Sequence, residues 1–390
     1  MQIFKDTVIE SGRSNRPQLR AWARASIQKL SRIDQTLERP NTTSQGWIDI
    51  ARVMNNAALI DVYRGSHRSA RELCELQLRW IERLICSHGP AACGDLAIQP
   101  WVNLGRLLRI RGEHERALQH FALLPDTLAG RSIRLGPIDL DTSTWLQLVE
   151  ANSLWGFLNA VYIIDSTKTH LASGAFAEAV RFLRHVRTLV RDTPSVLLDE
   201  AELIALASMK RYEEAIAVTE GIGWQQDSYV KLVRVTYRVA LLAALGSTEA
   251  ARRLVAQLSE RVLRGDLGAP RDQRVVRYLE QLGRVTAHLG LRELTERILR
   301  LGLRAARHVV DVPLELSFLE SLLKLDGIAE REALAVEREA LLGDCLYVTL
   351  LEPRGRTVDP LAAADPIFDE LRRLLERAAS TSSCGAATEV

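Results

Sequence analysis

The chain has 390 residues, of which 47% are hydrophobic, 26% charged and 5% aromatic, and its 51 basic residues nearly balance its 49 acidic ones. A formal net charge of +2 does not favour nucleic-acid binding, which normally requires a strong basic excess. Five scattered cysteines predict reduced thiols rather than a disulfide framework. With no signal peptide and no run of about 18 apolar residues in view, the sequence predicts a cytoplasmic protein without a membrane contact.

Four segments are expected in chain order. Residues 1–45 are predicted to form a polar extension with one helix near residues 18–37, followed by a linker rich in turn formers. Residues 46–344 are predicted to form a helical array, since Leu, Ala, Arg and Glu dominate there and favour helix. The predicted class is therefore all-α. Residues 345–379 are expected to cap the array, and residues 380–390 to form a disordered tail.

A short pattern recurs six times within the predicted array. A turn residue, mostly glycine, is followed five residues later by an alanine or its substitute, with apolar helical stretches on both sides. This pattern predicts antiparallel helix-turn-helix hairpins, in which the small residue lets two helices approach closely. A seventh, degenerate hairpin is expected at residues 328–342. The six pairs are Gly65 and Ala70, Gly112 and Ala117, Gly174 and Ala179, Lys210 and Ala215, Gly246 and Ala251, and Gly290 and Thr295.

Two departures from the regular array are expected. Residues 125–141 interrupt the helical pattern, and the insertion is either a functional loop or a loop that covers an apolar groove. From residue 142 a single long helix is expected to reach residue 170. Near the end of the chain, Asp365 and Pro366 are suited to open a final amphipathic helix at residues 367–378.

The second hairpin carries a motif with a family resemblance. Its residues at the motif positions are Trp101, Leu104, Gly105, Leu108, Gly112, Ala117 and Phe121. This spacing resembles the tetratricopeptide repeat (TPR), and the turns at residues 174–179 and 210–215 are similar to the inter-helix turn of that family. The resemblance covers about residues 50–310. It implies a right-handed α-solenoid of about six to seven TPR-like hairpins, whose concave groove binds a protein or peptide.

A fainter similarity lies at residues 358–374. This stretch resembles the terminator of repeat arrays in some bacterial signalling proteins and regulators. The resemblance implies a capped array.

The resemblance also implies which residues face the groove. In that family the first helix of each hairpin lines it, Asn side chains pair the backbone of an extended peptide, and Lys or Arg binds carboxylates. A side-chain amide suits this role because it offers both a donor and an acceptor. Leu59 stands where a basic residue would accompany Asn56, which argues against a clamp for a terminal carboxylate. The expected groove residues are Asn56, Asn103, Arg106, Asp165, Lys168, Tyr237, Arg277, Gln281 and Arg284.

No catalytic motif, phosphate loop or dinucleotide fingerprint is visible, so the sequence predicts no cofactor. Cys86, His88 and Cys93 lack a fourth zinc ligand, and an inter-repeat loop is expected there instead of a metal site. Arginines at 106–116 and 297–307 alternate with acidic residues, which predicts solvated helix faces rather than anion-binding stripes.

Together these features predict a non-catalytic adaptor, chaperone or scaffold. Two alternatives stay open. The chain could be a regulator that senses a peptide or metabolite, with its N-terminal helix as the output. It could also be an accessory enzyme on a helical-repeat scaffold.

Overall fold

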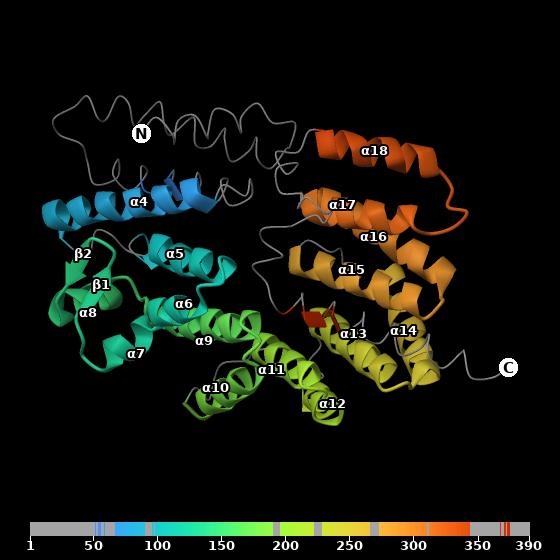
Figure 1. Cartoon of the computed structure of the whole chain (residues 1–390), viewed down its shortest axis with the longest axis horizontal. Helices are drawn as coiled ribbons and strands as arrows, with labels where there is room; N and C mark the ends of the chain where they lie inside the picture. Colours follow the sequence, from blue (N-terminus) through green and yellow to red (C-terminus); the bar gives the residue numbers. More distant parts are fainter. Residues whose placement is uncertain are drawn as a thin grey trace. The chain divides into compact units, whose positions relative to one another are not determined.

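The computed structural model describes residues 51, 54, 55, 58, 67–89, 96, 98–189, 196–221, 228–265, 273–309, 312–343, 367, 370, 371, 373 and 374. These residues contain fifteen helices and two short strands, which confirms the predominantly helical class (Figure 1). The chain divides into two compact units. Unit 1 comprises residues 1–173 and 346–364, and unit 2 comprises residues 174–345 and 365–390. The expected helix near residues 18–37, and also Gly65, Leu59 and Asn56, lie outside the described residues.

Unit 1 contains a helical hairpin flanked by further helices. Helix α5 packs on α6, α4 packs on α5, and α9 packs on both helices of the hairpin. The elements are α4 (His67–His88), α5 (Ile98–Ile110), α6 (His114–Phe121), α7 (Leu123–Leu128), β1 (Ile133–Leu135), β2 (Ile138–Leu140), α8 (Thr142–Ala151) and α9 (Trp155–Ala172).

The insertion predicted at residues 125–141 contains a small antiparallel β-hairpin. Gly136 adopts φ +65 between the two strands, a conformation that glycine reaches without a steric penalty and that suits a tight hairpin turn. On the exposed face, Arg134 lies opposite Asp139. The four Ile and Leu side chains of the strands point inward, because both strands alternate buried and exposed residues.

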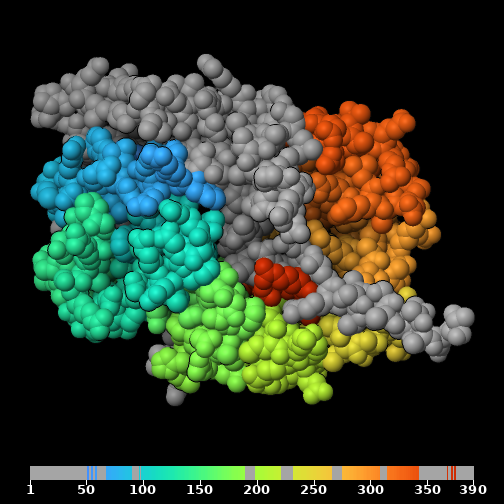
Figure 2. All heavy atoms as spheres, viewed as in Figure 1, coloured from blue at the N-terminus to red at the C-terminus, as the bar shows by residue number. Residues whose placement is uncertain are grey.

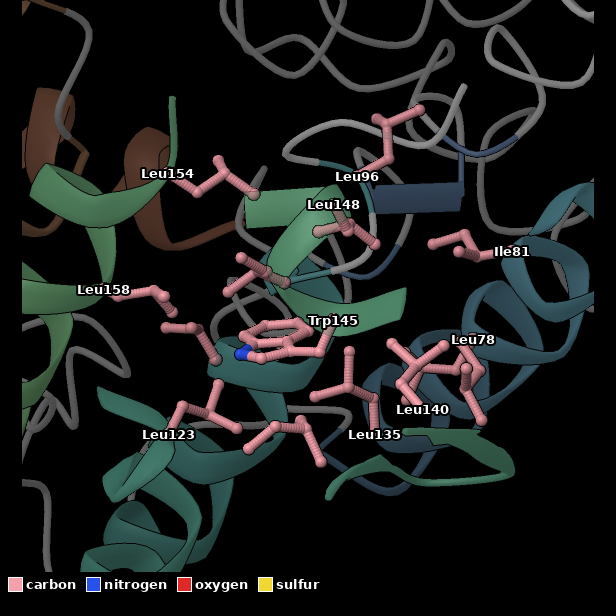
Figure 3. Packing of buried hydrophobic residues seen from close by; sticks show 14 of the residues in the cluster. Leu78, Ile81, Leu96, Leu123, Leu135, Leu140, Trp145, Leu148, Leu154 and Leu158 are labelled. Atoms are coloured by element: carbon pink, nitrogen blue, oxygen red, sulfur yellow. The ribbon is translucent and has the colours of Figure 1, made fainter. Parts of the chain in front are cut away.

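These inward side chains join a hydrophobic cluster around Trp145 of α8, which is fully buried (Figure 3). Strand β2 packs on α4 and α8, and β1 packs on α7. The indole Nε1 of Trp145 donates a hydrogen bond of 2.6 Å to Thr127 Oγ1, so its polar group is satisfied inside the cluster. The insertion therefore covers apolar surface of unit 1.

The single long helix expected at residues 142–170 is wrong, because a turn separates α8 from α9. Ser153 adopts φ 53. The backbone N–H of Leu154 donates to the carbonyl of Val149 at 2.9 Å, which closes the end of α8 as in a Schellman motif. The Asn152 side chain also donates to a carbonyl of the last turn. These local bonds end the helix within an otherwise helical sequence.

Unit 2 is a succession of helices in which each helix packs on the next. In addition α13 packs on α15, α15 on α17 and α14 on α16, so alternate helices of successive hairpins lie beside one another. The elements are α10 (Phe176–Leu189), α11 (Val196–Ser208), α12 (Tyr212–Gly221), α13 (Ser228–Ala244), α14 (Thr248–Leu263), α15 (Gln273–His288), α16 (Arg292–Val309), α17 (Val312–Leu323) and α18 (Arg331–Gly343).

The recurrent turn is confirmed wherever it is described. Gly112, Gly174, Gly246 and Gly290 have φ between +72 and +79, and Lys210 has φ 63. At Gly112 and three of the other turns, two backbone hydrogen bonds return to the preceding helix in the Schellman pattern. The small residue that follows each turn has no exposed surface (0%) at Ala70, Ala117, Ala179, Ala215, Ala251 and Thr295.

Close helix approach also explains glycines inside the helices. A Cβ on Gly105 of α5 would lie 2.6 Å from Cε1 of Phe121 in α6, and a Cβ on Gly283 of α15 would lie 2.5 Å from Cδ2 of Leu299 in α16. Neither helix pair could approach so closely with a larger residue. Among the described helices, none combines the length and the apolar character that a membrane span requires.

Candidate functional site

A polar stripe runs along one face of α5. Gln99, Asn103 and Arg106 are spaced by four and three residues, which places them on the same side of the helix. Gln99 Nε2 donates to Asn103 Oδ1 at 3.3 Å, and Asn103 Nδ2 donates to Asn55 Oδ1 at 3.0 Å. Both polar atoms of Asn103, which is only 9% exposed, therefore already have amide partners.

The stripe continues into an ion cluster between α5 and α9. Arg106 contacts both carboxylate oxygens of Asp165 through Nε and Nη2, at 3.1 and 2.9 Å. Arg109 Nη1 donates to Asp165 Oδ1 at 3.0 Å. The side chains of Asp165 and Arg109 are 3% and 4% exposed, whereas that of Arg106 is 41% exposed. The cluster is thus buried on the Arg109 side and open to solvent on the Arg106 side.

The electrostatics of Asp165 follow from this arrangement. Burial by itself would raise the pKa of the Asp165 carboxyl, but the charges and hydrogen bonds of Arg106 and Arg109 outweigh it and hold the pKa below its ordinary value. Asp165 therefore stays ionised and ties α9 to α5.

The prediction of a solvated face at residues 106–116 is wrong for Arg109, which is buried. Its partner Asp165 lies 56 residues further along the chain, so the local pattern of charges gave no sign of the contact. The signal in the sequence was Asp165 itself, a carboxylate in an apolar stretch of α9, because a buried charge requires a partner. Gln99 and Asn55 were also missed. Lys168, on the next turn of α9, is half-buried.

A second polar group lies in unit 2 and connects three of its helices. Tyr237 of α13 is fully buried, and its ring meets that of Tyr278 of α15 edge to face, with 6.1 Å between the centroids. The Tyr278 hydroxyl donates a short hydrogen bond to Glu200 Oε1 of α11. Tyr237 was expected to face a groove, but in this structure it has no surface that a partner could touch.

The remaining expected residues of unit 2 surround the buried carboxylate of Glu280. Arg284 Nη2 donates to Glu280 Oε1 at 2.8 Å, Ser317 Oγ also donates to Oε1, and Gln281 Nε2 donates to Oε2 at 3.1 Å. Burial alone would raise the pKa of Glu280, but Arg284, Ser317 and Arg277 lower it below the ordinary value. Gln281 and Arg277 are buried, and Arg284 is half-buried.

Of the nine expected groove residues, Lys168 is half-buried, and Tyr237 and Arg277 are buried. The other six fall into three groups. Asn56 lies outside the described residues. Asn103, Arg106 and Asp165 of unit 1 are joined in one stripe of amides and charges. Gln281 and Arg284 of unit 2 meet at Glu280, which the sequence did not single out. Within the described part of the chain, no group of three or more His, Cys, Asp or Glu residues could hold a metal ion. Cys93 is outside that part.

Comparison of the chain with protein-family models and with curated proteins returns no match in either case.

Proposed function

We propose that this chain is a non-catalytic adaptor, chaperone or scaffold, built as a solenoid of TPR-like hairpins that binds a protein or an extended peptide in its concave groove. The polar stripe of unit 1 is the observation that carries the proposal. It consists of Asn55, Gln99, Asn103, Arg106 and Asp165, contributed by successive segments of the chain.

The chemistry of this stripe suits a peptide backbone. A peptide unit offers one N–H and one C=O, and a side-chain amide can pair with both. In the absence of a peptide, Asn55 and Gln99 supply the same kind of partner to Asn103. Arg106, with its half-exposed side chain, stands at the open edge of the stripe, where it can bind an acidic side chain of the ligand.

The test is co-purification. Tagged wild-type protein is used to recover partners from the native lysate, and these are identified by mass spectrometry. The Asn103→Ala variant removes both amide bonds at the centre of the stripe and should lose the partner. The matched control is Gln119→Ala, an amide on the exposed face of α6, which should retain the partner. The binding of the recovered partner is then measured directly by fluorescence anisotropy for all three proteins.

Equal recovery of the partner by the Asn103→Ala and Gln119→Ala proteins would contradict a role for the stripe. Circular dichroism and thermal unfolding of each variant separate lost binding from lost structure. Turnover of a recovered small molecule would instead support an accessory enzyme.

A sensor of a peptide or metabolite is the second candidate, and one atom favours it. Gln281 Oε1 is buried and has no hydrogen-bond partner among the residues that the structure describes, although the same side chain donates to Glu280. An N–H or O–H group of a small polar ligand would satisfy this acceptor. A thermal shift with such a ligand that disappears in Gln281→Leu, without any protein partner, would support the sensor.

A further inference from the structure

An array of helical hairpins normally holds together through contacts between neighbouring hairpins. Unit 2 largely follows this rule, since each helix packs on the next and α15 lies beside both α13 and α17. Figure 2 shows the same order at the surface, where the yellow-green atoms of α12 adjoin the yellow atoms of α13 and α14. A contact between α11 and α15 departs from the rule, because it connects two hairpins that are separated by a third, the hairpin of α13 and α14.

This contact is the hydrogen bond that the Tyr278 hydroxyl of α15 donates to Glu200 Oε1 of α11, across 78 residues of sequence. The helix between them in the array, α13, supplies Tyr237, whose ring meets that of Tyr278 edge to face. All three side chains are fully buried. Tyr278 therefore contacts the middle hairpin with its ring and the first hairpin with its hydroxyl.

The bond between α11 and α15 also implies that the array is bent. Packed neighbouring helices lie about 8–10 Å apart, so in a flat array two helices separated by a third would lie at about twice that distance, with the third between them. The bond from Tyr278 to Glu200 therefore requires the array to bend towards the side of these two residues. Because the bend of an array sets the shape of its concave surface, contacts that hold the bend also hold that shape.

We infer that Glu200, Tyr237 and Tyr278 form a strap that encloses α13 and holds three successive hairpins, α11 to α16, as one body. These hairpins then open together instead of one at a time, and their bend is set before any ligand binds. The last hairpin, α17 and α18, lies outside the strap, although α17 packs on α15 and α16. Conformational change within unit 2 is thereby directed to that end of the array. The strap includes no residue of the polar stripe in unit 1, so it does not rest on the proposed function.

Hydrogen exchange of the backbone amides in the full-length protein, followed by mass spectrometry, tests the strap. The variant Tyr278→Phe removes the hydroxyl and keeps the ring against Tyr237. It should accelerate the exchange of the α13 amides at least about tenfold, because the loss of a buried hydrogen bond releases the enclosed hairpin. The matched control is Tyr212→Phe at the half-buried start of α12, where the hydroxyl has no hydrogen-bond partner among the described residues. This control should leave the exchange of α13 within about threefold of the wild type.

Helix α17 provides a comparison within the same protein. It packs on α15, as α13 does, so in an array held by neighbour contacts alone a weakened α15 would affect both helices alike. With the strap, α13 is enclosed and α17 is not. The α17 amides of Tyr278→Phe should therefore exchange within about threefold of the wild-type rate.

A second substitution tests whether Glu200 and Tyr278 act as a pair. Glu200→Leu removes the acceptor on α11 and should accelerate the exchange of α13 by a factor similar to that of Tyr278→Phe. Because either substitution breaks the same bond, the double variant should exchange within about threefold of the faster single variant. Circular dichroism checks that each variant is folded.

Three outcomes overturn the inference. The first is an exchange of α13 that is equally fast in the wild type and in Tyr278→Phe. The second is an equal acceleration of α13 and α17, which is the behaviour of neighbour contacts alone. The third is a double variant in which the two accelerations multiply, because Glu200 and Tyr278 would then act separately. The first two outcomes need only Tyr278→Phe, so the test stands even where Glu200→Leu does not fold.

Discussion

Trp101 of α5 and His120 of α6 are joined by three contacts at once. Their rings stack with 3.4 Å between the centroids and 17° between the planes. Trp101 Nε1 donates to the His120 carbonyl at 3.1 Å, and His120 Nε2 lies 2.8 Å from the Trp101 carbonyl. Since a carbonyl oxygen can only accept, Nε2 carries the proton and the imidazole is held in one neutral tautomer. The pair therefore fastens the two helices of the second hairpin.

This pair predicts that the stability of the protein depends on pH. Burial is the main reason that the pKa of His120 is lowered from 6.5 to about 4. The unfolded chain binds a proton near pH 6.5 and the folded chain only near pH 4, so stability is complete above the first value and falls as the pH drops towards the second. The slope from this single group is at most about 1.4 kcal/mol per pH unit.

Urea unfolding at several pH values between about 4.5 and 7.5 measures this slope. The variant His120→Gln should remove it, and His185→Gln, at an exposed position of α10, should leave it in place. An unchanged slope in His120→Gln would show that another group is responsible.

A second prediction concerns the close approach of α5 and α6. A Cβ on Gly105 would lie 2.6 Å from Cε1 of Phe121 and 2.9 Å from Cδ2 of His120, so both rings must move in Gly105→Ala. We expect this overpacking to lower the free energy of unfolding by about 1–3 kcal/mol. The control is Gly156→Ala in α9, where a Cβ meets nothing within 4 Å and the better helix propensity of alanine should stabilise by up to about 1 kcal/mol.

The smaller side chain in Phe121→Leu makes room for the added methyl group. The double variant with Gly105→Ala should therefore lose less stability than the sum of the two single variants, by about 1 kcal/mol. Strict additivity would mean that the ring is not the obstacle.

A third prediction separates the two arginines of the ion cluster. Asp165→Asn leaves the buried Arg109 without its counter-charge, which should cost about 3–5 kcal/mol of unfolding free energy. Arg106→Gln should lower the free energy of unfolding by on the order of 1 kcal/mol or less, because Arg106 is partly solvated and the ion pair between Asp165 and Arg109 remains. Because the pKa of Asp165 is lowered on folding, its contribution is complete above about pH 4 and is lost only as the pH falls through the lower folded value. Urea unfolding at neutral pH compares the two variants, and equal costs would contradict the assignment.

The features that were predictable from sequence are those set by local backbone geometry. The turn at Gly112 requires a residue in the left-handed conformation, and the position of Ala117 requires a small residue where two helices meet. Both constraints restrict the residue type at a fixed position and are therefore visible in the sequence. The stripe on α5 was partly predictable for the same reason, because Asn103 and Arg106 share a helix face. The β-hairpin was not predicted, since strands of three residues are too short to show an alternating pattern.

The pairings that distinguish this chain from a generic helical array depend on contacts between distant residues. Asp165 accepts a hydrogen bond from Arg109, 56 residues away in the sequence, and Glu370 accepts one from Ser208, 162 residues away. Nothing in the local sequence of either partner specifies the other. The burial of Tyr237 likewise depends on Tyr278, two helices further along. The sequence around Tyr237 does not show this contact, and for that reason a buried residue was predicted to line the groove.

The last prediction compares two equivalent turns that carry different residues. Lys210 occupies the left-handed position (φ 63) at the end of α11, is exposed, and donates its N–H to the Ala207 carbonyl at 2.9 Å. The left-handed conformation costs a residue with a side chain about 1–2 kcal/mol, and Lys210→Gly removes this cost. Because glycine also gives the unfolded chain more freedom, which opposes the gain, the net stabilisation should be about 1 kcal/mol. Gly246 has φ 77, and a Cβ there would meet nothing within 4 Å, so Gly246→Ala should cost about 1 kcal/mol through the backbone alone. Urea unfolding measures the free energy of unfolding of both single variants and of the double variant. The two changes should have opposite signs and similar size, and they should add because the sites lie in separate turns, so the double variant should be close to wild type. A loss of stability in Lys210→Gly would mean that the lysine side chain makes a contribution larger than the strain it imposes.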